Sequence, residues 1–137
     1  MPGYSGTPLV TKLGIKSGFQ IYVVNAPDDY RELIEPLPED VRMVSRLSSN
    51  LDLVHIFTSR KKELADALRS YRAALKPTAV VWVSWPKKSS KLPTDVTEDT
   101  VRELALPLGF VDIKVCAVDE TWSGLKLEIR KNQREQA

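Results

Sequence analysis

Two short apolar runs flank one amphipathic segment in the middle of the chain. Residues 53–57 (LVHIF) and residues 80–83 (VVWV) are apolar at consecutive positions. Between them, large apolar side chains recur at helical spacing, and Pro77 ends the pattern; these side chains are Leu64, Leu68, Tyr71 and Leu75. Strands that are apolar on both faces are typical of parallel sheets covered on both sides. The pattern therefore predicts strand, helix, strand, and an α/β fold.

The N-terminal part predicts short elements. Residues 8–13 form one or two helical turns with Thr7 as N-cap, and Gly14 ends them. A strand follows at residues 20–24, and a short helix at residues 30–35.

Residues 41–44 form a second short strand whose direction the pattern leaves open. Only residues 45–52 separate it from the next strand, whereas a parallel crossover normally needs a dozen residues or more. We expect either an unusually tight return or an edge strand.

After the second long strand, the pattern predicts one more helix and a hairpin. Thr97 caps a helix that ends at Pro107 and Gly109. Residues 111–118 and 125–130 read as an antiparallel pair of strands. We expect one domain over residues 1–137, with a flexible start at residues 1–7 and a frayed tail at residues 131–137.

Composition and charge exclude several classes of function. The 137 residues carry a formal net charge of only +2, so neither a nucleic acid nor a membrane surface is expected as partner. With one histidine, His55, and one cysteine, Cys116, no metal site and no disulfide are expected. No signal-peptide pattern and no membrane-spanning run stand in the sequence, which favours a cytoplasmic location.

The order of elements resembles the second half of a class I methyltransferase-like Rossmann fold. The phrases that carry the resemblance are LGIKSGFQIYVVNAP at the first long strand and LKPTAVVWVSW at a later one. It implies a small three-layer, mostly parallel sheet with a C-terminal antiparallel hairpin, truncated relative to that fold. GYSGTPLVTKLGI, VSWPKK and VCAVDETWSGLK also resemble a small bacterial family of unknown function, which implies a fold and no activity.

The chain departs from the methyltransferase pattern at the places that hold the cofactor. The loop after the first strand, residues 24–28 (VNAPD), has no glycine, and Ser45 and Arg46 stand where an acidic residue usually ends the second strand. The third strand is missing, and residues 57–59 (FTS) replace an Asp/Asn-Pro-Pro-aromatic motif. We therefore expect no cofactor, and S-adenosylmethionine in particular is not expected.

Several polar and aromatic side chains follow the predicted strands, at the edge where ligands bind in open parallel sheets. The candidate ligand-binding residues are Asn25, Ser59, Arg60, Ser84, Trp85, Lys87, Lys88, Asp119 and Trp122. One hypothesis is an anion or nucleotide site, in which the helix beginning near Ser59 and the two lysines bind the anion and a tryptophan stacks on a base. The other, which we favour, is that the lysines are solvated and the tryptophans pack the rim.

The remaining reactive side chains predict no catalytic residue. Asp119 and Glu120 are adjacent, so they are expected to pair with Lys87 or Lys88 rather than to act together. His55 lies inside a strand and reads as a core histidine, which leaves no Ser-His-Asp set. Cys116 stands among valines without a basic group to lower its pKa, and reads as an inert buried thiol.

Two functions remain open on the sequence. The preferred hypothesis is a non-catalytic module that binds a small anionic ligand, a nucleotide or a protein partner on a degenerate methyltransferase-like fold. The alternative is a divergent transferase that uses S-adenosylmethionine or another adenosine-containing cofactor. The uncovered edge at residues 41–44 also makes a homodimer conceivable.

Overall fold

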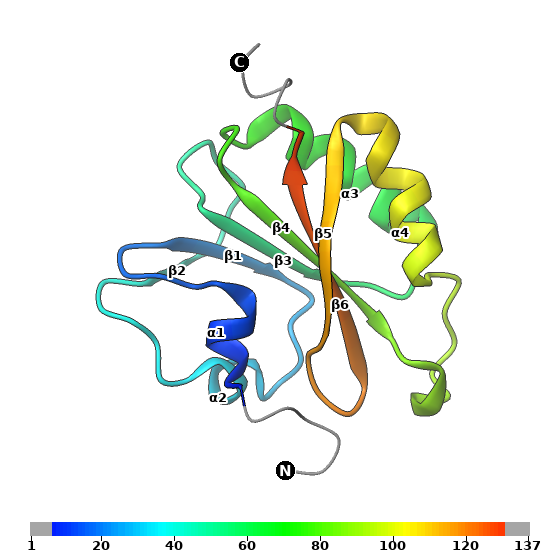
Figure 1. The fold of residues 1–137 in the computed structure, drawn as a ribbon, viewed down its shortest axis with the longest axis horizontal. Coiled ribbons are helices and arrows are strands. Elements are labelled where there is room, and N and C mark those ends of the chain that lie inside the picture. The colour runs from blue at the N-terminus through cyan, green and yellow to red at the C-terminus, as the bar shows by residue number, and fades with distance from the viewer. Residues whose placement is uncertain (1–6, 131–137) are drawn as a thin grey trace.

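Six strands form a single mixed sheet in the order β2-β1-β3-β4-β6-β5 (Figure 1). The computed structural model describes residues 7–130. The strands β1 to β4 run parallel, whereas β6 is antiparallel to both β4 and β5. Their bounds are Gln20–Val24 (β1), Arg42–Val44 (β2), Leu53–Phe57 (β3), Val80–Pro86 (β4), Phe110–Ala117 (β5) and Trp122–Ile129 (β6). The predicted α/β class and the C-terminal antiparallel hairpin are confirmed.

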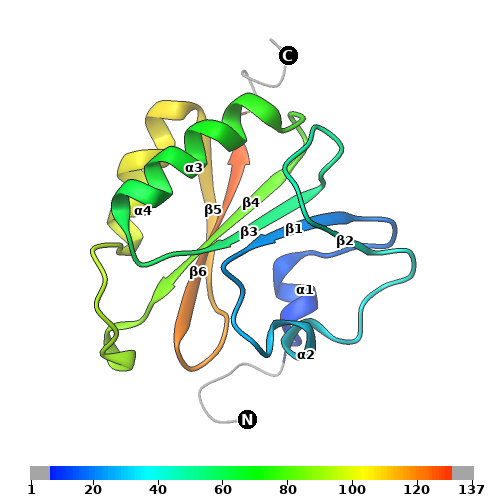
Figure 2. The same ribbon diagram turned by 180° about the vertical axis from the view of Figure 1, so that it is seen from behind.

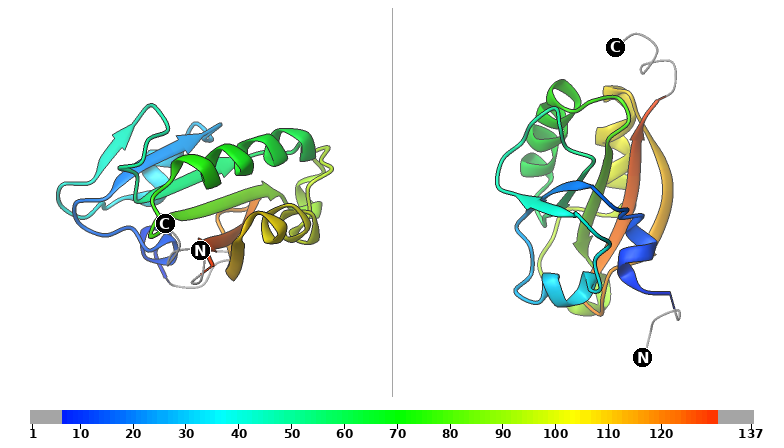
Figure 3. Two further views of the ribbon diagram at one scale, coloured as in Figure 1. Left: turned by 90° about the horizontal axis from the view of Figure 1, so that it is seen from above. Right: turned by 90° about the vertical axis from the view of Figure 1, so that its left-hand side faces the viewer.

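Helices cover the sheet on both faces, which makes three layers (Figures 1 and 2). One face carries α1 (Leu9–Leu13) and α2 (Tyr30–Ile34), and the other carries α3 (Lys61–Ala74) and α4 (Glu98–Ala105). Figure 3 shows the sheet between α1 and α3. Two 3₁₀ turns, η1 (Lys88–Ser90) and η2 (Leu106–Leu108), complete the elements.

Alternation along the strands divides the core into two clusters. In β3, which is buried throughout, Val54 and Ile56 pack under α3 and α4, whereas Leu53 and Phe57 pack under α1 and α2. The indole Nε1 of Trp82 donates a hydrogen bond to the carbonyl of Leu13 (3.0 Å), which fastens α1 to β4.

The structure shows the direction of β2, which the sequence left open. This strand pairs parallel with β1, and within residues 7–130 it has no neighbour on its outer side. The connection from β2 to β3 crosses β1 without a helix. In place of a helix, Leu47 and Leu51 of this connection pack against the core on the α3 side of the sheet. The third strand of the methyltransferase fold is therefore absent from the described residues, as the sequence predicted.

A few boundaries differ from the sequence prediction. Strand β4 continues through Pro86 because its last three residues pair with β6. Helix α1 has Pro8, not Thr7, at its N-cap position. The predictions for residues 1–6 and 131–137 lie outside the described residues.

Candidate functional site

The strand order reverses between β1 and β3, at the carboxyl edge of the sheet. From β1 the chain passes to β2 on one side, and from β3 it passes to β4 on the other. The loops that follow β1 and β3 therefore diverge over this edge. In open α/β sheets, a ligand binds in the crevice at such a switch point.

Asn25 forms the turn directly after β1. Its φ of 58° places it in the left-handed region, which glycine adopts freely and asparagine tolerates better than most residues. Its side-chain amide donates to the carbonyl of Phe57 (3.1 Å) and to Oε1 of Glu63 (3.4 Å). Asn25 thus makes the sharp turn without a glycine and joins the ends of β1 and β3.

Glu63 brings a carboxylate to the same edge from the first turn of α3. The hydroxyl of Thr58 donates to its Oε1 (2.6 Å), and the same hydroxyl accepts from the backbone N–H of Arg60 (3.1 Å). Thr58 is buried, whereas Glu63 is exposed. Because Asn25 and Thr58 both bond Oε1, they orient an exposed carboxylate whose second oxygen is not used by either of them.

The N-terminus of α3 already has an internal partner. The backbone N–H of Lys61 donates to Oδ1 of Asp95 (2.6 Å), and the carbonyl of Ser59 accepts from the backbone N–H of Asp95 (3.1 Å). An acidic side chain therefore lies where the sequence hypothesis placed an external anion. Of the predicted residues here, Ser59 is bound to this loop and Arg60 is exposed.

A buried polar chain joins α2 to the middle of the sheet. The hydroxyl of Tyr30 lies 2.9 Å from Nδ1 of His55, and Nε2 of His55 lies 2.7 Å from Oγ of Ser84. All three side chains are buried. Burial lowers the pKa of His55 from 6.5 to about 3, so the imidazole is neutral at neutral pH. The prediction of a core histidine is confirmed. Ser84 belongs to this buried series of hydrogen bonds and does not lie at the ligand-binding edge of the sheet.

The remaining predicted residues gather at the β5–β6 hairpin, except for Trp85. Trp85 is buried in the cluster under α3 and α4, whereas Trp122 packs edge-on against Phe57, with ring centroids 5.1 Å apart. Oδ1 of Asp119 accepts from the backbone N–H groups of Thr121 and Trp122 (2.8 Å each), which shapes the turn.

The basic loop at the end of β4, residues 86–93 (PKKSSKLP), meets the hairpin through its backbone. The N–H of Lys87 donates to the carbonyl of Thr121 (2.8 Å), and Lys88 is exposed in η1. The expected pairing of Asp119 or Glu120 with Lys87 or Lys88 is therefore not found among the described residues, because Asp119 bonds the backbone of its own turn and the two loops are joined by a backbone hydrogen bond instead.

The structure thus divides the predicted site into two groups and adds residues that the sequence reasoning missed. Asn25 and Arg60 belong to one hydrogen-bonded group, because Asn25 and Thr58 both bond Glu63 and Thr58 accepts from the backbone N–H of Arg60. Lys87, Asp119 and Trp122 meet at the hairpin turn. The missed residues are Tyr30, Glu63 and Asp95, whereas Thr58 was expected at this edge after the strand at Leu53. Glu63 had a signal, because a carboxylate in the first turn of a helix after a strand is placed at the ligand-binding edge. The other contacts join residues far apart in the sequence.

Two further observations concern residues 7–130 as a whole. No helix in this part of the chain combines the length and apolar character needed to cross a membrane. The same residues contain no group of three or more His, Cys, Asp or Glu side chains arranged to hold a metal ion.

Similarity to solved structures identifies the fold. A SAM-dependent methyltransferase from Aquifex aeolicus matches with a TM-score of 0.62 at 12% identity, over 88% of this chain and 87% of that protein. The tRNA methyltransferase TrmK from B. subtilis matches with a TM-score of 0.55 at 11% identity, over 92% and 67% of the two chains. A protein of the NADB-Rossmann superfamily from Streptococcus agalactiae matches with a TM-score of 0.57 at 11% identity, over 93% of this chain and 70% of that protein. The fold is methyltransferase-like. No family model and no curated protein matches the chain.

This similarity corrects the prediction that the chain has no cofactor. Solved structures with the same fold over nearly the whole chain include SAM-dependent methyltransferases. The prediction relied on the missing glycine after the first strand, but Asn25 adopts the left-handed conformation there. It also relied on a missing acidic residue after the second strand, whereas Glu63 brings an exposed carboxylate to the same edge from another element.

Proposed function

We propose that this chain is a divergent methyltransferase-like domain that binds S-adenosylmethionine, or another adenosine-containing ligand, at the edge between β1 and β3. The observation that supports it is the exposed carboxylate of Glu63, which Thr58 and Asn25 hold at the point where strand order reverses. A carboxylate in this position suits the hydroxyls of a ribose, which donate hydrogen bonds to it.

In this proposal, the residues of this chain bind the ligand and orient it. The left-handed conformation of Asn25 turns the backbone sharply after β1, where a glycine would do the same. Glu63 accepts from the ligand, and Thr58 fixes the carboxylate from the protein side. S-adenosylmethionine, when bound, supplies an electrophilic methyl group. We assign the step to no catalytic residue.

The comparisons favour this function over the non-catalytic module that the sequence reasoning preferred. Neighbours in fold include SAM-dependent methyltransferases, and Asn25 adopts the left-handed conformation in the loop that lacks a glycine. The hypothesis that an external anion binds at the N-terminus of α3 loses its main support, because the carboxylate of Asp95 occupies that position.

Calorimetric titration with S-adenosylmethionine and with adenosine tests the proposal. We expect both to bind the wild type, and Glu63→Gln to weaken both by roughly tenfold, because one hydrogen bond to a charged group contributes about 1.5 kcal/mol or more. Glu103→Gln, on the exposed side of α4, is the matched control and retains the wild-type affinity.

Two outcomes contradict the proposal. One is the absence of heat and of thermal stabilisation with both ligands at millimolar concentration. The other is equal loss of affinity in the Glu63 and Glu103 variants, which would mean that only the general charge of the protein matters.

A further inference from the structure

The helices α1 and α2 cover only part of their face of the sheet. They pack over β1, β3 and β4, whereas the hairpin of β5 and β6 lies at the far end of the sheet order. On the same side, Lys126 and Glu128 of β6 pair with each other (3.6 Å). A cleft of about 510 Å³ therefore remains between α1 and β5. Its size is within the range of small-molecule sites, about 300–1,000 Å³.

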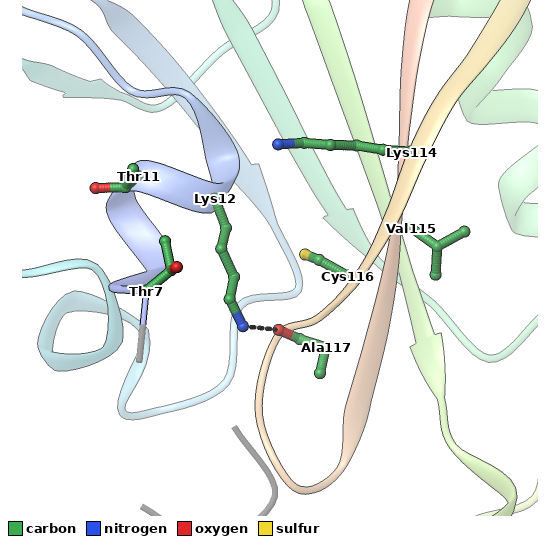
Figure 4. A pocket seen from close by; sticks show the side chains of 7 residues that line it. All are labelled: Thr7, Thr11, Lys12, Lys114, Val115, Cys116 and Ala117. Atoms are coloured by element: carbon green, nitrogen blue, oxygen red, sulfur yellow. Dashed lines mark hydrogen bonds between the residues drawn. The ribbon is translucent and has the colours of Figure 1, made fainter. Parts of the chain in front are cut away.

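Two lysines line this cleft from opposite walls, one on α1 and one on β5 (Figure 4). Lys12 reaches across from α1, with Nζ 3.4 Å from the carbonyl oxygen of Ala117. Lys114 points toward α1 from β5, and the thiol of Cys116 lies between the two lysines. The seven lining residues include no carboxylate; besides the lysines they are Thr7, Thr11, Val115, Cys116 and Ala117.

Both walls of the cleft are held in place. Helix α1 is fastened to the sheet by the bond from Trp82 to Leu13, and Gly14 ends it in a left-handed cap. Strand β5 is paired with β6 along its length, apart from the irregularity between Asp112 and Lys114. That irregularity places Lys114 on the α1 side opposite Lys126, whereas Asp112 bonds Arg102 of α4 on the other side (2.8 Å). The bulge thus separates the lysine from the nearest carboxylate of its own strand.

We propose that the cleft between α1 and β5 binds a small organic anion, with its phosphate or carboxylate group between Lys12 and Lys114. Charge-assisted hydrogen bonds from two ammonium groups suit such a group. The remaining lining, from Cys116 and Ala117, suits a small apolar body. The site is separate from the edge between β1 and β3 and does not depend on the function proposed there.

Cys116 gives this proposal a direct test, because it is the only cysteine of the chain. It is half-buried, and burial raises the pKa of its thiol, although Lys12 and Lys114 oppose that rise. Iodoacetamide is uncharged, so the lysines neither attract nor repel it, and the pH dependence of the alkylation rate separates access to the cleft from a change in the pKa of the thiol. The probes are phenyl phosphate, benzoate and inorganic phosphate, with benzyl alcohol as the neutral analogue, all at one ionic strength set with chloride.

We expect phenyl phosphate, benzoate or both to slow alkylation by roughly tenfold at about ten times their dissociation constant. Comparison of phenyl phosphate with benzoate distinguishes a phosphate site from a carboxylate site. Comparison of phenyl phosphate with inorganic phosphate shows whether the apolar ring of the probe contributes to binding. Lys114→Gln and Lys12→Gln should each abolish most of the protection, measured as the ratio of rates with and without the probe. Lys88→Gln, an exposed lysine in η1, retains it.

The proposal is overturned if none of the anions protects Cys116 or if benzyl alcohol protects equally. It is also overturned if the Lys114→Gln protein is protected as well as the wild type. Because Lys114 is exposed and has no role in the core, this variant should fold even where Lys12→Gln does not.

Discussion

His55 shows how one buried residue determines the chemistry of the interior. It lies between Tyr30 and Ser84, and burial keeps its imidazole neutral. If Nδ1 accepts from the hydroxyl of Tyr30, Nε2 carries the proton and donates to Ser84. Apolar neighbours in the same cluster, such as Leu53 and Phe57, exclude water from these three side chains, so they bond one another.

The pKa of His55 predicts a loss of stability in acid. The unfolded histidine takes up a proton near pH 6.5 and the folded one only near pH 3, so the unfolded state binds more protons between these values. The free energy of unfolding should therefore fall as the pH falls through this window, by about 1.4 kcal/mol per pH unit. The ring signals of the single histidine in NMR spectra should not titrate between about pH 7.5 and about pH 4.5 as long as the protein stays folded. A midpoint near 6.5 would contradict the burial.

Ser84 offers a second test of the same chain. Ser84→Ala removes the partner of Nε2 in a fully buried position, so we expect a loss of about 1–3 kcal/mol in the free energy of unfolding. Ser89→Ala, in the exposed turn η1, is the control and should change it by less than about 0.5 kcal/mol. Chemical denaturation of both variants measures the difference.

At the scale of elements, helix α3 depends on a cap from a distant loop. Its N-cap residue, Arg60, makes no side-chain capping bond, and the first turn is capped instead by Asp95, 34 residues later in the chain. Helix α4, in contrast, has a local capping box between Thr97 and Thr100. The pattern alone therefore revealed the cap of α4 and not that of α3.

We expect Asp95→Ala to destabilise the protein by about 1 kcal/mol, because the N–H of Lys61 loses a charged acceptor at the positive end of the helix dipole. Asp66→Ala, on the exposed middle of α3, removes the same charge without a cap and should cost less than half as much. Equal effects in thermal unfolding would show that Asp95 acts only through net charge.

At the scale of the whole molecule, strand β2 forms an edge of the sheet that has no neighbouring strand among the described residues. The backbone N–H of Arg42 donates to the carbonyl of Phe19, so the N–H of the next residue, Met43, points away from β1. The homodimer through this edge stays a prediction. If it forms, Met43→Pro should convert it to a monomer without disturbing the pairing with β1.

Light scattering after size-exclusion chromatography measures both proteins at the same concentration. A wild type that stays monomeric at high micromolar concentration contradicts the dimer, as does a dimer that survives in the proline variant. Circular dichroism of the variant serves as the control for folding.

The sequence determined the elements because their signals are local. Helical spacing from Leu64 to Leu75, the apolar runs at β3 and β4, and Thr97 with Gly109 each lie within a short window, so periodicity and capping were sufficient. The order of these elements, with the phrases LGIKSGFQIYVVNAP and LKPTAVVWVSW, resembles a methyltransferase-like fold. The burial of His55 was also predictable, since it stands within an apolar strand.

The candidate site was decided only by the tertiary structure. The parallel direction of β2, the meeting of Asn25 with Glu63, the capping of Lys61 by Asp95 and the cleft between Lys12 and Lys114 join segments that are distant in the sequence. The left-handed conformation of Asn25 also depends on its bonds to Phe57 and Glu63. The pattern of a sequence reports which face of an element is apolar. Which polar groups then meet is determined by strand order and register, because these bring together the ends of elements that have no local interaction.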